Sequence, residues 1–242
     1  MATEEPPRLP PVDPAAARRP GPTTMTPEIL ATLLVEGDDE LAAWALESAL
    51  SERSRAEVFD GLLREAMALI GSRWSEGRWS IADEHLASQT VVRALDRIRP
   101  PATPESRVGP LAVLAGVTGE HHVIGLLCLE QVLADAGWTI ANLGPDLPEA
   151  DLARFVAANE ARLVCLTAAQ PERAGAVRDA VAACRGAAVP GRAIRILLGG
   201  TLANDRALVA DLHLDFATES LTAAAAYARR LANEPGTEPT LD

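Results

Sequence analysis

The sequence has 242 residues, of which 48% are apolar and 3% aromatic, so it can bury the core of one large domain or two small ones and favours helix-rich architectures over a β-sandwich. Its formal net charge of −12 argues against direct binding of nucleic acid, because phosphate contacts need a basic surface. Every Lys or Arg position is an arginine, which excludes chemistry that depends on a Schiff-base lysine or a P-loop lysine.

The chain starts with a Pro-, Ala- and Arg-rich stretch, residues 1–24, that has no periodicity and is expected to be disordered. It lacks the apolar segment of a secretory signal, and no apolar run elsewhere approaches membrane-spanning length. Cys128, Cys165 and Cys184 lie on apolar stretches without CxxC spacing, which is typical of buried free thiols in a reducing compartment. We therefore expect a cytoplasmic protein.

Apolar residues recur at helical spacing through residues 25–99, which predicts an N-terminal helical bundle. A Thr followed by Pro opens the first helix, and short loops join four helical segments, so neighbours should pack antiparallel as in a four-helix bundle. The four segments are TPEILATLLVEG, DDELAAWALESALS, SRAEVFDGLLREAMALIGSRW and SIADEHLASQTVVRALDRIR.

A Pro-rich linker at residues 100–107 precedes a second domain, residues 108–233, in which short apolar runs alternate with helical ones. This alternation predicts a parallel sheet covered on both faces, a Rossmann-like (flavodoxin-like) α/β domain that binds ligands beyond the carboxyl ends of its strands. The predicted strands are 110–117, 138–143, 162–168, 193–198 and 214–217; the predicted helices start near 122 and cover 148–158, 171–185, 201–210 and 219–232. The tail, residues 234–242, is expected to be disordered.

The stretch GEHHVIG follows the first predicted strand and therefore lies at the ligand-binding edge. Histidine is the commonest metal ligand, and a ligating histidine usually donates its second ring N–H to a carboxylate. Glu120 stands two residues before His122, and Gly125 lets the backbone pass close to a bulky ligand. Zinc needs three or four protein ligands, which this stretch does not supply, whereas one axial histidine is enough for a metal that carries its own macrocycle.

This stretch resembles the D-x-H-x-x-G signature of cobalamin (B12)-binding Rossmann-like domains, with Glu120 in place of Asp. Two further landmarks of that family fall at the expected strand ends: Thr167 where the family has the Ser of S-x-L, and the glycine pair Gly199 and Gly200. The resemblance implies that His122 is the lower axial ligand of cobalt, having displaced the dimethylbenzimidazole base. It also implies that the displaced nucleotide tail enters the core beside the sheet.

A second group of candidate residues lies where the third predicted helix ends and the fourth begins. Trp74 ends one helix, Ser80 and Asp83 form a capping box that starts the next, and Glu84 and His85 follow within its first turn. Across an antiparallel helix pair, the side chains of Trp74, Glu84 and His85 should lie roughly level with one another. An ordinary explanation remains open, because a Trp at a helix end is usually a core residue and acidic residues in a first turn complement the helix dipole.

The spacing matches the W-x9-E-H motif of CarH-like B12-dependent photoreceptors, in which a four-helix bundle lies over a B12-binding Rossmann domain. The resemblance implies that Trp74 covers the 5′-deoxyadenosyl group of adenosylcobalamin and that Glu84 hydrogen-bonds to it. It also implies that His85 becomes an upper cobalt ligand after light has broken the Co–C bond. His121 does not fit E-x-H and is interpreted as a polar neighbour.

Members of this photoreceptor family usually carry an N-terminal MerR-type DNA-binding domain, and nothing in the segment before the bundle resembles one. We therefore expect a sensor that is not an enzyme and does not bind DNA by itself. It would act by changing its own assembly, as a homo-oligomer, or by binding a protein partner such as a transcription regulator.

Three alternatives remain. The main one is a corrinoid shuttle protein of a cobalamin-dependent methyltransferase, which would need an open upper face and typically lacks a Trp/Glu/His cap. A module that senses B12 without light would keep Glu120, His122 and the glycine pair but would not need His85. The last is a flavodoxin-like domain that binds no B12, since a fold by itself does not determine function.

Overall fold

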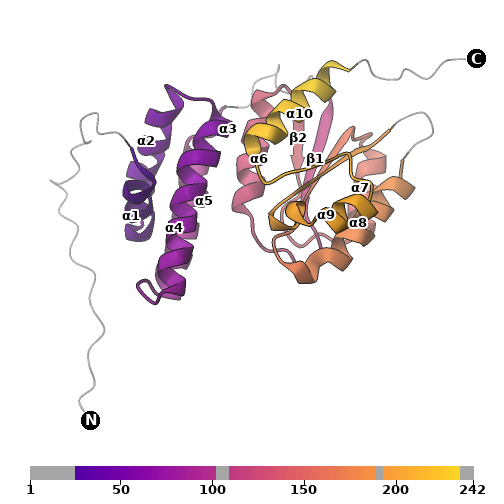
Figure 1. The fold of residues 1–242 in the computed structure, drawn as a ribbon. Coiled ribbons are helices and arrows are strands. Elements are labelled where there is room, and N and C mark those ends of the chain that lie inside the picture. Colours follow the sequence, from indigo (N-terminus) through magenta and orange to yellow (C-terminus); the bar gives the residue numbers. More distant parts are fainter. Residues whose placement is uncertain (1–24, 102–108, 189–192, 235–242) are drawn as a thin grey trace, which may run out of the picture.

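The computed structural model describes residues 25–101, 109–188 and 193–234. The predictions for residues 1–24, for nearly all of the linker and for the last eight residues lie outside the described residues. Within them the chain forms a helical bundle and an α/β unit that lie side by side (Figure 1). This arrangement confirms the fold class predicted from the sequence.

The bundle contains helices whose starts are fixed by local side-chain caps. Thr26 accepts a hydrogen bond from the Ile29 N–H, and Ser54 and Ser80 each form a capping box with the acidic residue three positions on. The helices are α1 (Pro27–Glu36), α2 (Asp39–Leu50), α3 (Arg55–Val58), the π-helical segment η1 (Phe59–Leu63), α4 (Arg64–Ser75) and α5 (Ile81–Arg97).

The third predicted helix is continuous but not uniform, because α3, η1 and α4 follow one another without a break. In η1 the Arg64 N–H reaches back five residues to the Phe59 carbonyl, so the backbone there makes a π-turn. Its residues Phe59, Leu62 and Leu63 are buried, and only Asp60 among its side chains is charged. Such turns interrupt α-helices frequently at functional sites.

The α/β unit is a parallel five-stranded sheet in the order β2-β1-β3-β4-β5. Its strands are β1 (Leu111–Gly116), β2 (Thr139–Asn142), β3 (Leu163–Thr167), β4 (Arg195–Gly199) and β5 (Phe216–Ala217), and its α-helices are α6 (Ile124–Asp135), α7 (Glu149–Ala158), α8 (Ala174–Gly186), α9 (Arg206–Asp211) and α10 (Leu221–Asn233). Alternate strand residues point to opposite faces, so one face packs on α6 and α10 and the other on α7, α8 and α9.

The prediction of one helix over 201–210 was wrong in detail. A 3₁₀ segment, η4 (Thr201–Asn204), comes first and ends at Asp205, whose carboxylate accepts hydrogen bonds from the Ala207 and Leu208 N–H groups and starts α9. The helix predicted over 171–185 likewise begins with a 3₁₀ turn, η3 (Pro171–Arg173), before α8. Both departures lie between the end of a strand and the α-helix that follows it, where the chain has to turn back along the sheet.

The two units share a continuous apolar core. Cys128 and Val132 of α6 and Ala225 of α10 belong to the same buried cluster as the bundle residues, so these two helices lie between the bundle and the sheet (Figure 1). Polar contacts reinforce the junction: Arg55 donates to Gln131 (2.9 Å) and to Asp135 (3.1 Å) near the end of α6. No helix of the described ranges is long and apolar enough to cross a membrane.

Candidate functional site

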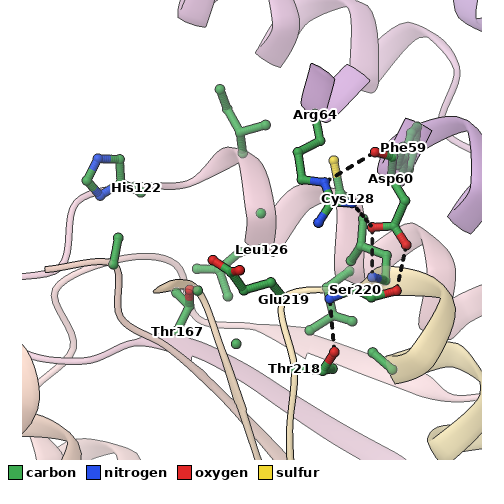
Figure 2. Close-up of a pocket in the computed structure, with 18 of the residues that line it drawn as sticks. Phe59, Asp60, Arg64, His122, Leu126, Cys128, Thr167, Thr218, Glu219 and Ser220 are labelled. Carbon is green, nitrogen blue, oxygen red and sulfur yellow. Dashed lines mark hydrogen bonds and ion pairs between the residues drawn. The ribbon is translucent and has the colours of Figure 1, made fainter. Parts of the chain in front are cut away.

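A cavity of about 500 Å³ lies between the bundle and the carboxyl edge of the sheet. Its volume falls within the range of small-molecule pockets. Figure 2 shows His122 at one end of it and Asp60, Phe59 and Cys128 at the other. The walls come from η1 and α4 of the bundle, from α6 and α10, and from the loops after β3, β4 and β5; among the lining residues are Leu63, Arg64, Met67, Gly125, Leu126, Thr167, Gly199, Gly200, Thr218, Glu219 and Ala224.

His122 is held by Glu120 through both its backbone and its ring. One Glu120 carboxylate oxygen, Oε1, accepts from the His122 N–H at 2.9 Å and lies 2.5 Å from the His122 Nδ1. The Glu120 side chain is only 2% exposed, whereas that of His122 is 67% exposed. The buried carboxylate therefore orients a ring that faces open space.

The second Glu120 oxygen, Oε2, accepts from the Ala169 N–H at 2.6 Å, which ties the histidine loop to the end of β3. Burial acts to raise the pKa of Glu120, but the hydrogen bonds from the His122 and Ala169 N–H groups and from the His122 ring outweigh it and leave the pKa below its ordinary value. Glu120 is thus a carboxylate at neutral pH. An anionic acceptor at Nδ1 favours the tautomer in which Nδ1 carries the proton and Nε2 keeps its lone pair.

A metal could be bound here only if the protein supplied one of its ligands and a cofactor supplied the others. Among the residues that the structure describes, no three His, Cys, Asp or Glu side chains gather as they would around a metal held by protein alone. His122 could donate one ligand to such a metal, since Nδ1 is bonded to the Glu120 carboxylate and Nε2 is left for the metal. The residues present therefore fit a cofactor that brings its own equatorial ligands.

Of the glycine pair, Gly200 has a backbone conformation and surroundings that only glycine accommodates without strain. Gly200 has a φ of 78°, and a Cβ at this position would approach the Ala168 carbonyl oxygen to 2.5 Å. Gly199 and Gly200 both line the cavity, together with Thr167 and Gly125. Five of the residues singled out in the sequence, His122, Gly125, Thr167, Gly199 and Gly200, are therefore brought to one cavity, and Glu120 supports the first of them.

Trp74, Glu84 and His85 are not among the residues that line this cavity. Trp74 is 48% exposed, and the His85 side chain is 72% exposed with its Nε2 3.7 Å from the Glu84 carboxylate. Glu84 also accepts a hydrogen bond from the Ser88 hydroxyl at 2.9 Å. The convergence of the three side chains on one patch stays a prediction.

The course of the helices shows on which side these residues lie. The α3–η1–α4 segment runs antiparallel to α6, because Arg55 pairs with Gln131 and Asp135 near the end of α6 whereas Met67 lines the cavity together with Ile124 at its start. The cavity-lining face of α4 continues from Met67 at helical spacing to Trp74, two turns beyond the start of α6.

Helix α5 leads to the same region. The Leu95 carbonyl accepts from the Gln131 side chain of α6 at 2.9 Å, and helical steps back along this flank reach Ser88 and then Glu84 and His85. Trp74 and the Glu84–His85 pair thus extend past α6 on the side of His122.

The sequence did not predict that the bundle forms part of the cavity wall. Phe59, Leu63 and Met67 line it, and the Asp60 carboxylate accepts from the Ser220 hydroxyl (2.8 Å) and from the Leu221 and Thr222 N–H groups (2.9 Å each) at the start of α10. The one signal for this contact is an acidic residue inside the apolar helical run VFDGLL.

A helical bundle lies over the carboxyl edge of a parallel α/β sheet, and a carboxylate-bonded histidine stands at that edge. This arrangement fits the class of proteins that bind a metal cofactor which brings its own equatorial ligands. Two family models support this class: residues 28–99 match one described as a B12 binding domain, and residues 110–227 match a second with the same description. The chain belongs to the B12-binding proteins, with an N-terminal helical B12-binding domain followed by a Rossmann-like B12-binding domain.

The curated relatives include two Myxococcus xanthus proteins. The HTH-type transcriptional repressor CarA is 32% identical over 154 residues, which cover 62% of this chain and 51% of the repressor. The HTH-type transcriptional repressor CarH is 29% identical over 167 residues, which cover 69% of this chain and 54% of that protein. The chain thus spans about half the length of these curated relatives.

Among solved structures, the monomethylamine corrinoid protein of Methanosarcina barkeri has the same fold. It superposes with a TM-score of 0.69 at 16% sequence identity, over 84% of this chain and 96% of the other. At this identity the likeness concerns the fold alone.

Proposed function

We propose that this chain binds adenosylcobalamin between the helical bundle and the Rossmann-like domain and acts as a light-responsive sensor rather than as an enzyme. The cofactor, when bound, supplies a cobalt–carbon bond that light can break. Every other part of the proposal concerns what the residues of this chain do around it.

His122 would hold the cobalt from below through Nε2, with Glu120 fixing the ring from the opposite nitrogen. The cavity that starts at His122 would take the nucleotide tail, with Thr167 and the Gly199–Gly200 turn along it. Trp74 and Glu84 would contact the upper ligand. His85, largely exposed, would offer its ring as an upper ligand in the illuminated state.

The observation that carries the upper-face part of this proposal is the exposed apolar surface at the end of the bundle. Trp74 (48% exposed) and Ile81 (58% exposed) are large apolar side chains next to the loop between α4 and α5. Trp74 continues the face of α4 that already lines the cavity. A flat ligand above His122 would cover an aromatic ring that otherwise costs free energy by facing water.

The output would be a change at a protein surface. Loss of the upper contacts would free the bundle end that bears Trp74 and His85, and the altered surface would change self-association or the binding of a protein partner such as a transcription regulator. The net charge of −12 disfavours direct contact of this chain with nucleic acid.

The main test is to load the chain with adenosylcobalamin in the dark and to follow its visible spectrum and molecular mass before and after illumination. We expect a light-induced spectrum distinct from that of the photolysed free cofactor, together with a change in mass or in partner binding. An illuminated complex with the spectrum of the free photoproduct would refute the sensor.

The upper-ligand role of His85 is tested in the same assay with His85→Ala, using His213→Ala as the matched control. His213 is exposed and bonds to the Asp211 carbonyl away from the cavity, so its loss should change nothing. We expect only His85→Ala to alter the illuminated spectrum, with both dark spectra unchanged.

The competing function is that of a corrinoid shuttle protein in a methyltransferase system, whose upper face must exchange methyl groups. The two functions differ in what the upper face favours. Tighter binding of methylcobalamin than of adenosylcobalamin, without a light response, would favour the shuttle, because Trp74 and Glu84 would then not contact an adenosyl group.

A further inference from the structure

The histidine loop, residues 117–123 between β1 and α6, is fastened to the loop that follows β2. Asp146 of that second loop makes two bonds to it. The Asp146 carboxylate accepts from the Gly119 N–H at 2.6 Å, and the Asp146 N–H donates to the Glu120 carbonyl at 2.8 Å. Asp146 therefore holds the backbone of Glu120, while the Ala169 N–H holds its side chain.

The backbone of Asp146 indicates that its side chain has a task. Its φ of 53° lies in the left-handed region, which glycine adopts most easily. Gly144, two residues earlier, has a φ of 79°, so the same short loop already places a glycine at another left-handed position. A carboxylate kept in this conformation costs free energy, and such backbone outliers cluster at functional sites. The bond to the Gly119 N–H is what the carboxylate adds here.

The histidine loop can be held at position 119 only through its backbone. Gly119 has a φ of 80°, and a Cβ there would come within 2.3 Å of the Arg173 Nη1. The buried Nε of Arg173 has no hydrogen-bond partner among the described residues, so this nitrogen does not bond the loop. The Asp146 carboxylate is the acceptor that fixes the Gly119 N–H.

The loop that carries Asp146 is itself anchored on both sides of this residue. The Asn142 side chain accepts from the Gly144 N–H at 3.0 Å. Gly116, at the end of β1, donates to the Gly144 carbonyl at 2.9 Å and accepts from the Leu147 N–H at 3.0 Å. Asp146 thus lies between two points that are bonded to the sheet, and it can hold a neighbouring loop in place.

We propose that Asp146 is a positioning residue for the cobalt ligand. By holding Gly119 and Glu120 it keeps the Glu120 carboxylate, and with it the His122 ring, in the binding geometry before the cofactor arrives. Asp146 is exposed and does not line the cavity, so it acts through Glu120. This inference rests on the proposed ligation of cobalt by His122, but not on light sensing.

The size of the effect follows from the population of the binding geometry. When only a fraction of the molecules hold the histidine loop in place, the apparent dissociation constant rises in proportion to the fraction lost. The loss of one exposed hydrogen bond should therefore weaken cofactor binding by about three- to tenfold.

Two variants separate the side chain of Asp146 from its backbone. Asp146→Gly removes the carboxylate and suits the left-handed conformation, so it adds no strain. Asp146→Asn keeps an acceptor oxygen and tolerates the same conformation, and it should behave like the unmodified chain. His213→Gly is the matched control, because His213 also has a positive φ, 49°, but bonds to the Asp211 carbonyl and does not line the cavity.

The first measurement uses the whole chain without cofactor and follows amide hydrogen exchange at Ala169. Its N–H donates to the Glu120 side chain and has no bond to Asp146. We expect exchange at Ala169 to be about three- to tenfold faster in Asp146→Gly and unchanged in Asp146→Asn and His213→Gly. An effect confined to Gly119 would overturn the inference, because Asp146 would then not position Glu120.

The second measurement uses cob(II)alamin bound to the whole chain, with every histidine labelled with the heavy nitrogen isotope. In electron paramagnetic resonance, a labelled histidine on cobalt splits the signal into two lines, whereas the unlabelled base of the cofactor splits it into three. We expect the two-line signal in the unmodified chain, in Asp146→Asn and in His213→Gly. Asp146→Gly should show a smaller share of this signal and a dissociation constant about three- to tenfold higher.

Equal shares of histidine-bound cobalt and equal dissociation constants in Asp146→Gly and His213→Gly would also overturn the inference. The variant His122→Ala separates it from the proposed function. If the two-line signal persisted in His122→Ala, the cobalt ligand proposed above would be wrong, whereas the exchange at Ala169 would still decide whether Asp146 positions Glu120.

Discussion

At the scale of single residues, the site depends on one buried carboxylate, that of Glu120, whose two oxygens bond three partners. Glu120 bonds the backbone and the ring of His122 through one oxygen and the Ala169 N–H through the other. Because every one of these partners donates, an uncharged amide cannot replace the carboxylate without placing an N–H against an N–H.

Glu120→Gln should therefore weaken corrinoid binding by about 10- to 100-fold, the usual cost of losing a partner that orients a metal ligand. The dissociation constant is measured by titration in the dark. His121→Ala is the matched control, because His121 is exposed and does not line the cavity. Equal affinities of the two variants would contradict the role assigned to Glu120.

Much of this residue-level picture could be predicted from the sequence. The spacing of Glu120, His122 and Gly125 after a strand selects His122 over His121, and the structure bonds Glu120 to His122. What spacing could not supply is the third partner, the Ala169 N–H, since that contact joins loops 49 positions apart in the chain. Local sequence contains no record of which distant backbone group completes a carboxylate's hydrogen bonds.

At the scale of elements, the junction between the bundle and α10 is a helix cap to which another unit contributes. The Ser220 hydroxyl caps α10 from within by accepting from the Ala223 N–H, and Asp60 on η1 adds to this cap by bonding the Leu221 and Thr222 N–H groups and the Ser220 hydroxyl. A negative charge there also complements the positive end of the helix dipole.

Asp60→Asn should lower the free energy of unfolding by about 1–2 kcal/mol at neutral pH. The amide keeps one acceptor oxygen, but its NH₂ group would face the N–H and O–H donors at the start of α10. The pKa of Asp60 is lowered in the folded state, so its contribution is fully present above the ordinary value of 3.8 and is lost as the pH falls through the lower folded value. Denaturant unfolding at several pH values checks this.

The difference between the unmodified chain and Asp60→Asn should accordingly shrink below about pH 4. Ser54→Ala offers a comparison, since its cap lies within the bundle and does not join the units. A difference for Asp60→Asn that stays constant down to strong acid would contradict a role for the ionised carboxylate.

The sequence predicted the positions of strands and helices better than the turns and irregular segments within and between them. Strand and helix positions follow from apolar periodicity, which local sequence carries, and nearly all of them are confirmed. The π-turn at Phe59–Leu63 and the split of 201–210 into η4 and α9 were missed. The π-turn carries Asp60, whose contact with the start of α10 joins distant parts of the chain, and η4 ends at Asp205, whose carboxylate caps α9.

At the scale of the whole molecule, the cavity wall is divided between two units that could otherwise separate. Ligand binding to such a cavity stabilises both units together, by about 2.7 kcal/mol at a free ligand concentration one hundred times the dissociation constant. Neither unit forms the cavity alone, since Met67 and Leu63 come from the bundle and Thr167 and Ala224 from the α/β domain.

Hydrogen exchange should show this shared stabilisation. Adenosylcobalamin in the dark should slow amide exchange in α4 as well as in α6 and α10, whereas α8, on the far face of the sheet, should be protected only to the extent of the global stability gain. Protection confined to the α/β domain would show that the bundle takes no part in binding.

The π-turn has a consequence for the angular phase of the long helix. Because the Arg64 N–H reaches back five residues to the Phe59 carbonyl, the turn takes up one residue more than an α-turn would. Deleting one residue within Phe59–Leu63 would therefore leave the segments on either side in phase, with Arg55 and Trp74 still facing as they do now. Deleting Gly71 would instead rotate Trp74 by about 100° against Met67 and the cavity. The extra residue makes this segment the one place in the helix where the chain can be shortened without turning its aromatic end away from His122.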